Sequence, residues 1–249
     1  MTGFDLTGRI GLVTGGGTGI GRGIAQGLAD AGATLVLAGR RGEVAAATAA
    51  TLPRAKAVSL DVTTRAAIDA VTADIVAQHG KLDILVTSAG TNRRLPTLEY
   101  DEASWDAVID TNLKGAFFCA QSAARVMKQN RWGRIIHVGS VAATLASSLQ
   151  TGYCASKAGL VQLNKVMAIE LASFGVTCNV ISPGPFRTPL SEWLFSDPHW
   201  VATVVKRVPM GRVGAMDDLP GIAVFLASES AAFVTGQNIN VDGGLSTGV

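Results

Sequence analysis

The chain has 249 residues, a length that suits one large domain or two small ones. Charged residues make up 16% of it, against about 25% in a typical domain, and the net charge is only +2. This balance favours neither a nucleic-acid partner nor a membrane surface as the binding target, because both attract a strong excess of positive charge.

Strand and helix signals then alternate along the chain without a linker. The first apolar run covers residues 9–14 and is followed by a glycine-rich turn and by Ile20, Ile24 and Leu28 at helical spacing. Later apolar runs that predict strands cover residues 34–38, 57–60, 82–86, 134–139 and 176–181. An alanine-rich stretch over residues 44–50 predicts a surface helix. The alternation predicts one α/β domain over residues 1–249, with a doubly wound parallel sheet and helices on both faces.

The turn after the first run reads TGxxxGxG from Thr14 to Gly21, and six glycines fall between positions 15 and 23. Glycines let the backbone approach a phosphate closely, and a helix N-terminus adds N–H donors and partial positive charge. The GxGxxG spacing of many dinucleotide sites is absent. The excess of glycine favours a phosphate-binding loop over a simple turn.

Tyr153 and Lys157 are four residues apart, and Ser140 precedes the tyrosine by thirteen residues. Positions i and i+4 share one face of a helix, so the ammonium group would lie beside the phenol. A nearby positive charge is expected to lower the phenol pKa from its usual value of about 10. The Ser140 hydroxyl follows the run at 134–139 and could hold a carbonyl oxygen for protonation. This arrangement indicates acid–base catalysis.

The motifs follow successive predicted strands. The second strand leads to Arg40 and Arg41, the third to Asp61, the fourth to Gly90 and the fifth to Ser140. In a doubly wound sheet, ligands bind outside the carboxyl ends of the strands. We therefore expect all of these residues at one edge of the sheet.

Together, the glycine turn, Asn112, Ser140 and the YxxxK pair resemble the short-chain dehydrogenase/reductase family over essentially the whole chain. The resemblance implies a Rossmann fold of about seven strands and hydride transfer between a nicotinamide cofactor and a carbonyl/alcohol carbon. It also implies a catalytic set of Asn112, Ser140, Tyr153 and Lys157. Tyr153 would be the general acid/base, while Lys157 would lower its pKa and hold the nicotinamide ribose. Ser140 would position the substrate oxygen, and Asn112 would distort its helix.

The same resemblance implies the cofactor site. Its residues are Thr14, Gly15, Gly17, Thr18, Gly19, Ile20, Gly21, Arg40, Arg41, Asp61, Val62, Ala89, Gly90, Tyr153, Lys157, Pro183, Gly184, Phe186 and Thr188. The second strand ends at Gly39, where an acidic residue would select NAD, and two arginines follow. A guanidinium group suits a phosphate dianion, so NADP(H) is favoured and NAD(H) stays open.

One departure from the family pattern is the pair Thr87 and Ser88, which replaces two asparagines after the fourth strand. Hydroxyls make fewer hydrogen bonds than amides. We therefore expect a less firmly held strand junction, with the chemistry unaffected.

The substrate is predicted to lie near Arg93 and Arg94, together with Ser140 and Tyr153, beneath a lid around residues 188–210. The paired arginines resemble those of the gluconate 5-dehydrogenase and deoxygluconate dehydrogenase branch, and arginine binds carboxylates well. A sugar acid or polyol is therefore expected. Equally, the two arginines could lie at the surface or at a subunit interface.

Two other functions stay open. A 3-oxoacyl-[acyl-carrier-protein] reductase would share every catalytic motif, but it needs a basic docking patch. The candidates for that patch are Arg125, Lys128, Arg131 and Arg134. A cofactor-binding protein without turnover would have no need of Tyr153 and Lys157 together.

The remaining composition points to an intracellular enzyme. Cys119, Cys154 and Cys178 lie in apolar contexts and are expected to be reduced, packed thiols. No signal peptide, membrane span or metal-binding cluster is expected, so the predicted location is cytoplasmic. The helix from Tyr153 onward is apolar on more than one face, which together with the family resemblance predicts a homotetramer.

Overall fold

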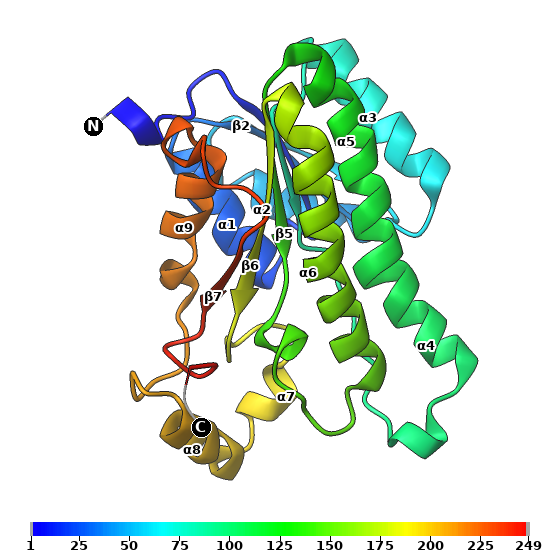
Figure 1. Cartoon of the computed structure of the whole chain (residues 1–249), viewed down its shortest axis with the longest axis vertical. Coiled ribbons are helices and arrows are strands. Elements are labelled where there is room, and N and C mark those ends of the chain that lie inside the picture. The colour runs from blue at the N-terminus through cyan, green and yellow to red at the C-terminus, as the bar shows by residue number, and fades with distance from the viewer. Residues whose placement is uncertain (1, 248–249) are drawn as a thin grey trace.

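A computed structural model of the protein describes residues 2–247 and contains a seven-stranded sheet in the order β3-β2-β1-β4-β5-β6-β7 (Figure 1). All neighbouring strands are parallel. Strands β2 and β3 are added on one side of β1, and strands β4 to β7 on its other side. The junction between β1 and β4 is therefore the switch point at which doubly wound sheets bind ligands. The predicted fold class is confirmed.

The strands are β1 (Ile10–Thr14), β2 (Thr34–Gly39), β3 (Ala55–Ser59), β4 (Ile84–Thr87), β5 (Gly133–Val138), β6 (Val176–Pro183) and β7 (Asn238–Val241). The first six lie where apolar runs predicted them. The edge strand β7 is half-exposed, so no continuous apolar run marked it.

The longer helices are α1 (Gly19–Asp30), α2 (Gly42–Ala49), α3 (Arg65–His79), α4 (Glu102–Ile109), α5 (Ala116–Asn130), α6 (Thr151–Leu171), α8 (Pro198–Arg207) and α9 (Pro220–Ala227). The short helix α7 spans Glu192–Phe195. Side chains of α1, α2 and α9 join one core cluster, and those of α3, α5 and α6 join the other. The helices thus cover both faces of the sheet, as Figure 1 shows.

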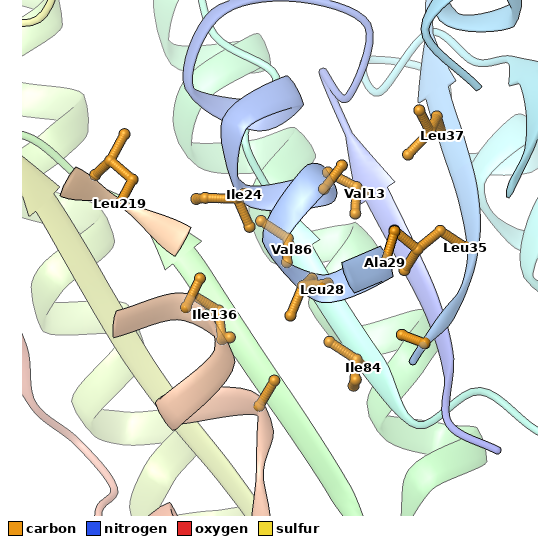
Figure 2. Close-up of a cluster of buried hydrophobic side chains, with 14 of the residues drawn as sticks. Val13, Ile24, Leu28, Ala29, Leu35, Leu37, Ile84, Val86, Ile136 and Leu219 are labelled. Atoms are coloured by element: carbon orange, nitrogen blue, oxygen red, sulfur yellow. The ribbon is translucent and has the colours of Figure 1, made fainter. Parts of the chain in front are cut away.

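The strands β1 to β6 contribute to two hydrophobic cores, one on each face of the sheet. Leu35 and Leu37 of β2 join the cluster under α1, while Val36 and Ala38 join the cluster on the opposite face. Figure 2 shows the first cluster, in which Ile24 and Leu28 of α1 meet residues of several strands. Burial on both faces explains why these strands read as continuous apolar runs, since a half-exposed strand would alternate.

The helix expected on the surface, α2, is half-buried. Ala45, Thr48 and Ala49 are buried, and the Thr48 hydroxyl donates a hydrogen bond to the Gly17 carbonyl at 2.9 Å. The small alanine side chains let one face of α2 approach the glycine turn, while Glu43, Ala46 and Ala47 on its other face are exposed, as expected of a surface helix.

The predicted lid contains α7 and α8, which lie beyond the carboxyl ends of the strands at the bottom of Figure 1. Asp197 caps α8 by accepting a hydrogen bond from the His199 N–H at 2.9 Å, and Pro198 occupies the first helical position. Within residues 2–247, no helix is both long and apolar enough to cross a membrane.

Candidate active site

A cavity of about 490 Å³ opens at the carboxyl ends of the central strands. Many predicted site residues line it: Gly15, Gly17, Thr18, Gly19, Ile20, Arg40, Arg41, Asp61, Val62, Ala89, Gly90, Tyr153, Lys157 and Thr188. Further lining residues outside the predicted cofactor set include Ser88, Thr111, Val138 and Leu190. Ser88 and Val138 lie at strand ends and Leu190 in the predicted lid, which is the signal that could have found them, whereas Thr111 lies in the helical turn Asp110–Gly115.

Two glycines of the turn adopt backbone conformations that other residues rarely take. Gly15 has a φ of 68° and Gly19 a φ of 52°. A Cβ atom on Gly15 would lie 2.7 Å from backbone atoms of Ser88 and Ala89, and one on Gly19 would lie 3.3 Å from Thr188. The turn therefore packs closely against the segments after β4 and β6, and it leaves its backbone open to a ligand.

Thr14 and Gly21 support this turn from behind, outside the cavity wall. Thr14 is 1% exposed, and its hydroxyl accepts hydrogen bonds from the N–H groups of Ser88 and Ala89 at 3.2 and 3.4 Å. A side chain on Gly21 would collide with the Gly15 carbonyl. These two residues hold the shape of the loop.

Arg40, Arg41 and Asp61 line the cavity where β2 and β3 end. The pKa of Asp61 is lowered, first by a hydrogen bond from the Thr63 backbone N–H and to a lesser degree by the charge of Arg40. Among the described residues, no carboxylate lies within 4.0 Å of the guanidinium group of Arg40 or Arg41. Both arginines are exposed and ready to bind an anion.

Tyr153 and Lys157 lie in the first two turns of α6 and face the cavity. The Lys157 Nζ atom is 5.7 Å from the Tyr153 ring centroid and donates a hydrogen bond to the Val138 carbonyl at 2.7 Å. Ser140 follows β5, and its hydroxyl accepts a hydrogen bond from the Ala142 N–H at 3.1 Å. The structure thus brings together the serine, phenol and ammonium groups that acid–base chemistry at a carbonyl requires.

The pKa of Tyr153 is shifted in the direction opposite to the one expected from the neighbouring lysine. Burial raises the pKa of Tyr153, while a hydrogen bond with Ser140 acts in the opposite direction. Burial also lowers the pKa of Lys157 to about 8. The ammonium group is bound to the Val138 carbonyl rather than to the phenol oxygen, so in the protein alone desolvation outweighs the charge effect.

Asn112 lies in a π-helical turn, Asp110–Gly115, between α4 and α5. Its side chain accepts a hydrogen bond from the Thr91 N–H at 2.8 Å and donates to the Thr91 carbonyl at 2.9 Å and the Ser156 hydroxyl at 3.1 Å. The helix distortion implied by the resemblance is present. Asn112 is 1% exposed and connects the segment after β4 to α6, so its side chain has a positioning role.

The junction between β4 and β5 at Thr87 contains a hydrogen bond that we did not expect from the replacement of asparagine by threonine. The Thr87 hydroxyl lies 2.7 Å from Nδ1 of His137 on the neighbouring strand β5, and both side chains are buried. Burial, with a further contribution from the Lys157 charge, lowers the pKa of His137 to about 3. His137 therefore stays neutral. Sequence reasoning missed it because it lies inside an apolar run.

Not every predicted residue lines the cavity. Phe186 is 4% exposed and packs against Gly214, while Gly184 packs against Asp242. Pro183 pairs with Val241 in the sheet, so the side chains of this segment support the site from the core. A second cavity of about 350 Å³ lies beside Phe186.

The two arginines that were expected near the substrate, Arg93 and Arg94, lie in different surroundings. Arg94 is half-buried, donates a hydrogen bond to the Ser148 carbonyl at 3.3 Å and stacks on Trp193 of the lid. Arg93 is exposed, and the Tyr100 hydroxyl donates to its carbonyl at 3.2 Å.

Comparison with known proteins agrees with this geometry. A family model described as enoyl-(acyl carrier protein) reductase matches residues 15–246. The 3-oxoacyl-[acyl-carrier-protein] reductase FabG of Escherichia coli is 38% identical over 96% of this chain and 97% of its own. The 2-dehydro-3-deoxy-L-rhamnonate dehydrogenase (NAD(+)) of Sphingomonas sp. is 35% identical over 96% of both chains.

Among solved structures, the gluconate 5-dehydrogenase of Burkholderia cenocepacia in complex with NADP and tartrate superposes with a TM-score of 0.95. It is 39% identical and matches 99% of this chain and 98% of its own. The similarity therefore extends over the whole sheet, the cavity and the lid. Given these matches and the arrangement of Ser140, Tyr153 and Lys157, the chain belongs to the short-chain dehydrogenase/reductase family and is an oxidoreductase that acts on CH–OH groups with NAD(P).

Proposed function

We propose that the protein uses NADP(H) to interconvert the secondary alcohol and the ketone of a sugar acid or a related polyol. The observation that carries the proposal is a proton-transfer site beside a cavity lined also by Arg40 and Arg41, which have no acidic partner within 4.0 Å in the part of the chain that the structure describes. The gluconate 5-dehydrogenase similarity supports the substrate class.

The residues of the chain fit a dinucleotide in this cavity. The glycine turn and the start of α1 would hold the pyrophosphate, since their residues line the cavity and a helix N-terminus offers backbone N–H donors to a phosphate. Asp61 and Val62 would contact the adenine, and Lys157 the nicotinamide ribose. When bound, the nicotinamide accepts or supplies the hydride.

The remaining chemistry belongs to the protein. In the direction of reduction, Ser140 donates a hydrogen bond to the substrate carbonyl oxygen and Tyr153 gives its phenolic proton to that oxygen as the carbon is reduced. In the direction of oxidation, Tyr153 takes the proton from the hydroxyl oxygen. Burial raises the phenol pKa of Tyr153, so Tyr153 is protonated at neutral pH and carries the proton that the first role requires.

The preference for NADP(H) rests on Arg40 and Arg41. Both line the cavity after β2, and neither has an acidic partner within 4.0 Å among the described residues. A 2′-phosphate dianion would supply that partner. The Burkholderia structure contains NADP, whereas the Sphingomonas relative is named for NAD(+), so the proposed preference for NADP(H) is supported mainly by the two arginines of this chain.

Replacing Arg40 with Asp should reverse the cofactor preference. The change removes a phosphate partner and places a carboxylate near the 2′ position, and charge-assisted hydrogen bonds contribute roughly 1.5–3 kcal/mol each. We expect kcat/KM with NADPH to fall at least about tenfold and kcat/KM with NADH to change little. Equal losses with both cofactors would show that Arg40 is structural.

The second candidate is a 3-oxoacyl-[acyl-carrier-protein] reductase, which the FabG relative favours. Two of the four basic residues expected to form the docking patch are bound within the protein. Arg134 is 2% exposed and bound to Ser228 and Glu229, and Arg131 donates to the Ser173 carbonyl. These residues also lie at the start of β5, about 20 Å of strand away from Ser140.

The test is a comparison of substrates with the purified wild-type protein. D-gluconate, its 5-keto form, neutral polyols and 3-oxoacyl thioesters would each be assayed with both cofactors by nicotinamide absorbance. The proposal predicts the highest kcat/KM with the sugar acid and NADP(H). A preference for the 3-oxoacyl thioester would support the reductase instead.

A further inference from the structure

Helix α6, which carries Tyr153 and Lys157, begins without a capping side chain of its own. Its N-cap residue is Gln150, whose side chain makes no capping hydrogen bond within the part of the chain that the structure describes. The first N–H groups of a helix have no partner inside the helix, and the N-cap side chain usually supplies one. Tyr153 lies in this first turn, so its phenol depends on a turn that lacks the usual support.

A side chain from another segment reaches this turn. Tyr100 precedes α4, which packs beside α6 (Figure 1). Its hydroxyl lies so close to Gly152 that a Cβ atom on that glycine would be 2.7 Å from the phenolic oxygen. Burial raises the pKa of Tyr100, and a hydrogen bond from the Gly152 backbone acts in the opposite direction. The hydroxyl itself donates to the Arg93 carbonyl at 3.2 Å. Tyr100 thus supplies from outside the helix the acceptor that Gln150 does not.

The same segment is attached to α6 at a second point. The Asn112 side chain binds both backbone groups of Thr91 and donates to the Ser156 hydroxyl at 3.1 Å. That hydroxyl donates to the Tyr153 carbonyl at 2.8 Å. Gly152 and Ser156 are four residues apart and therefore share one face of α6. The segment after β4 thus contacts α6 on both sides of Tyr153 along the helix axis.

The ring of Tyr100 is held by a different element from the one that its hydroxyl contacts. The ring meets Trp105 of α4 edge to face, with the ring centroids 6.3 Å apart and an interplanar angle of 83°. Asp101 caps α4 by accepting a hydrogen bond from the Ser104 N–H at 2.6 Å. Because α4 holds the ring and the hydroxyl contacts α6, the two parts of this side chain can be tested separately.

We propose that Tyr100 is a positioning residue for the reaction: its hydroxyl fixes the first turn of α6 and thereby aligns the Tyr153 phenol with Ser140. The inference rests on the proton-transfer role of Tyr153 in the proposed function. Tyr100 is outside the set of described residues that line the cavity, so it acts only through α6. Ser140 follows β5, whereas the phenol moves with the helix turn. A misplacement of about 1 Å at a reacting group can cost about 100-fold in rate, so a distant hydroxyl has a large effect on turnover.

The test compares Tyr100→Phe with Trp105→Phe, on the substrate that the wild-type protein turns over best. Tyr100→Phe keeps the ring and its contact with Trp105 and removes only the hydroxyl. We expect its kcat to fall about tenfold, with the Kd for NADPH within about threefold of the wild-type value, because Tyr100 does not line the cavity. Trp105→Phe alters the support of the ring and leaves the hydroxyl, so its kcat should change by less than about threefold.

Two further readouts distinguish positioning from a loss of stability. Gly152→Ala places a Cβ atom against the Tyr100 hydroxyl, so it should lower kcat in the wild-type background and lower it less in the Tyr100→Phe background. The pH profile of kcat should drop at every pH in Tyr100→Phe with its apparent pKa unchanged, since the identity of the proton donor stays the same.

Three results would overturn the inference: a kcat of Tyr100→Phe within about twofold of the wild-type value, additive losses with Gly152→Ala, or an equal kcat loss in Trp105→Phe. Tyr153→Phe separates these results from the proposed function. If Tyr153→Phe is inactive and Tyr100→Phe is unaffected, only the positioning role fails. If Tyr153→Phe keeps its activity, the proposed proton transfer fails, and the inference with it.

Discussion

Burial shifts the pKa values of Tyr153 and Lys157, the proposed catalytic pair of α6, in opposite directions. It raises the pKa of Tyr153 and lowers that of Lys157 to about 8. The phenol therefore holds its proton at neutral pH, and the lysine can lose its charge only slightly above neutrality. A bound cofactor would change both environments, because the ribose hydroxyls would give Lys157 a second partner.

The lysine shift has a consequence for stability that can be measured without substrate. Between pH 8 and 10.5 the unfolded chain keeps a proton on Lys157 that the folded protein has released. Unfolding therefore becomes less favourable as the pH rises through this window, by up to about 1.4 kcal/mol per pH unit. Below pH 8 both states are protonated, and the folded state bears the cost of the buried charge.

We therefore compare the unfolding free energies of the wild-type protein and of Lys157→Met by urea denaturation at several pH values. Between pH 8 and 10, the unfolding free energy of the wild-type protein should increase relative to that of the variant. The variant lacks the titrating group, and all other groups are shared. A difference that stays constant over this range would contradict the shifted pKa.

Sequence reasoning reached most of the residues around the cavity, because the TGxxxGxG and YxxxK spacings are local and depend on turn and helix geometry alone. It could not predict the direction in which the pKa of Tyr153 is shifted, because that direction depends on burial. It also grouped Arg93 with Arg94, although in the structure Arg94 contacts Ser148 and Trp193 and Arg93 is exposed. Phe186 was placed with the cofactor by its position in a motif, whereas its side chain packs in the core.

At the scale of elements, five of the six predicted strands are buried on both faces and therefore form continuous apolar runs, whereas β3 is half-exposed and was marked only by the short run at its end. The exposed edge strand β7 and the π-helical turn Asp110–Gly115 had no such signal. The contact between Thr87 of β4 and His137 of β5 was also hidden, because it joins residues 50 positions apart. It compensates for the missing asparagine pair at the strand junction.

Thr87→Val should remove this contact and leave Nδ1 of His137 without a partner. An unsatisfied buried polar group costs about 1–3 kcal/mol, so the thermal midpoint should fall by several degrees. The double variant Thr87→Val, His137→Phe removes both partners and should lose less stability than the two single variants together. Strict additivity would show that the contact contributes nothing.

At the scale of the whole molecule, α6 presents apolar side chains that the described chain leaves uncovered. Val166 and Ile169, three residues apart on one face, are 48% and 80% exposed. Phe233 is fully exposed in a loop that also places Gly236 near Ala168 of α6. Together with the 16% charge content, this surface supports the expected assembly into a tetramer.

Light scattering should give a mass near four times the 25.6 kDa of the chain. Ile169→Asp places a charge on the exposed face of α6 and should lower the mass, whereas Glu170→Gln, at the neighbouring exposed position, should not. A wild-type mass near 25.6 kDa at micromolar concentration would contradict the assembly.

The central claim is that Tyr153 carries the proton in a reaction whose hydride passes through the bound nicotinamide. Tyr153→Phe keeps the ring that lines the cavity and removes only the hydroxyl, so NADPH binding measured by titration calorimetry should stay within about threefold of the wild-type value. General acid–base catalysis contributes typically 10²–10⁴-fold, so kcat for the preferred substrate should fall by at least about 100-fold. A variant that binds NADPH normally and keeps more than about a tenth of the wild-type kcat, a loss below ~1.4 kcal/mol, would contradict this assignment.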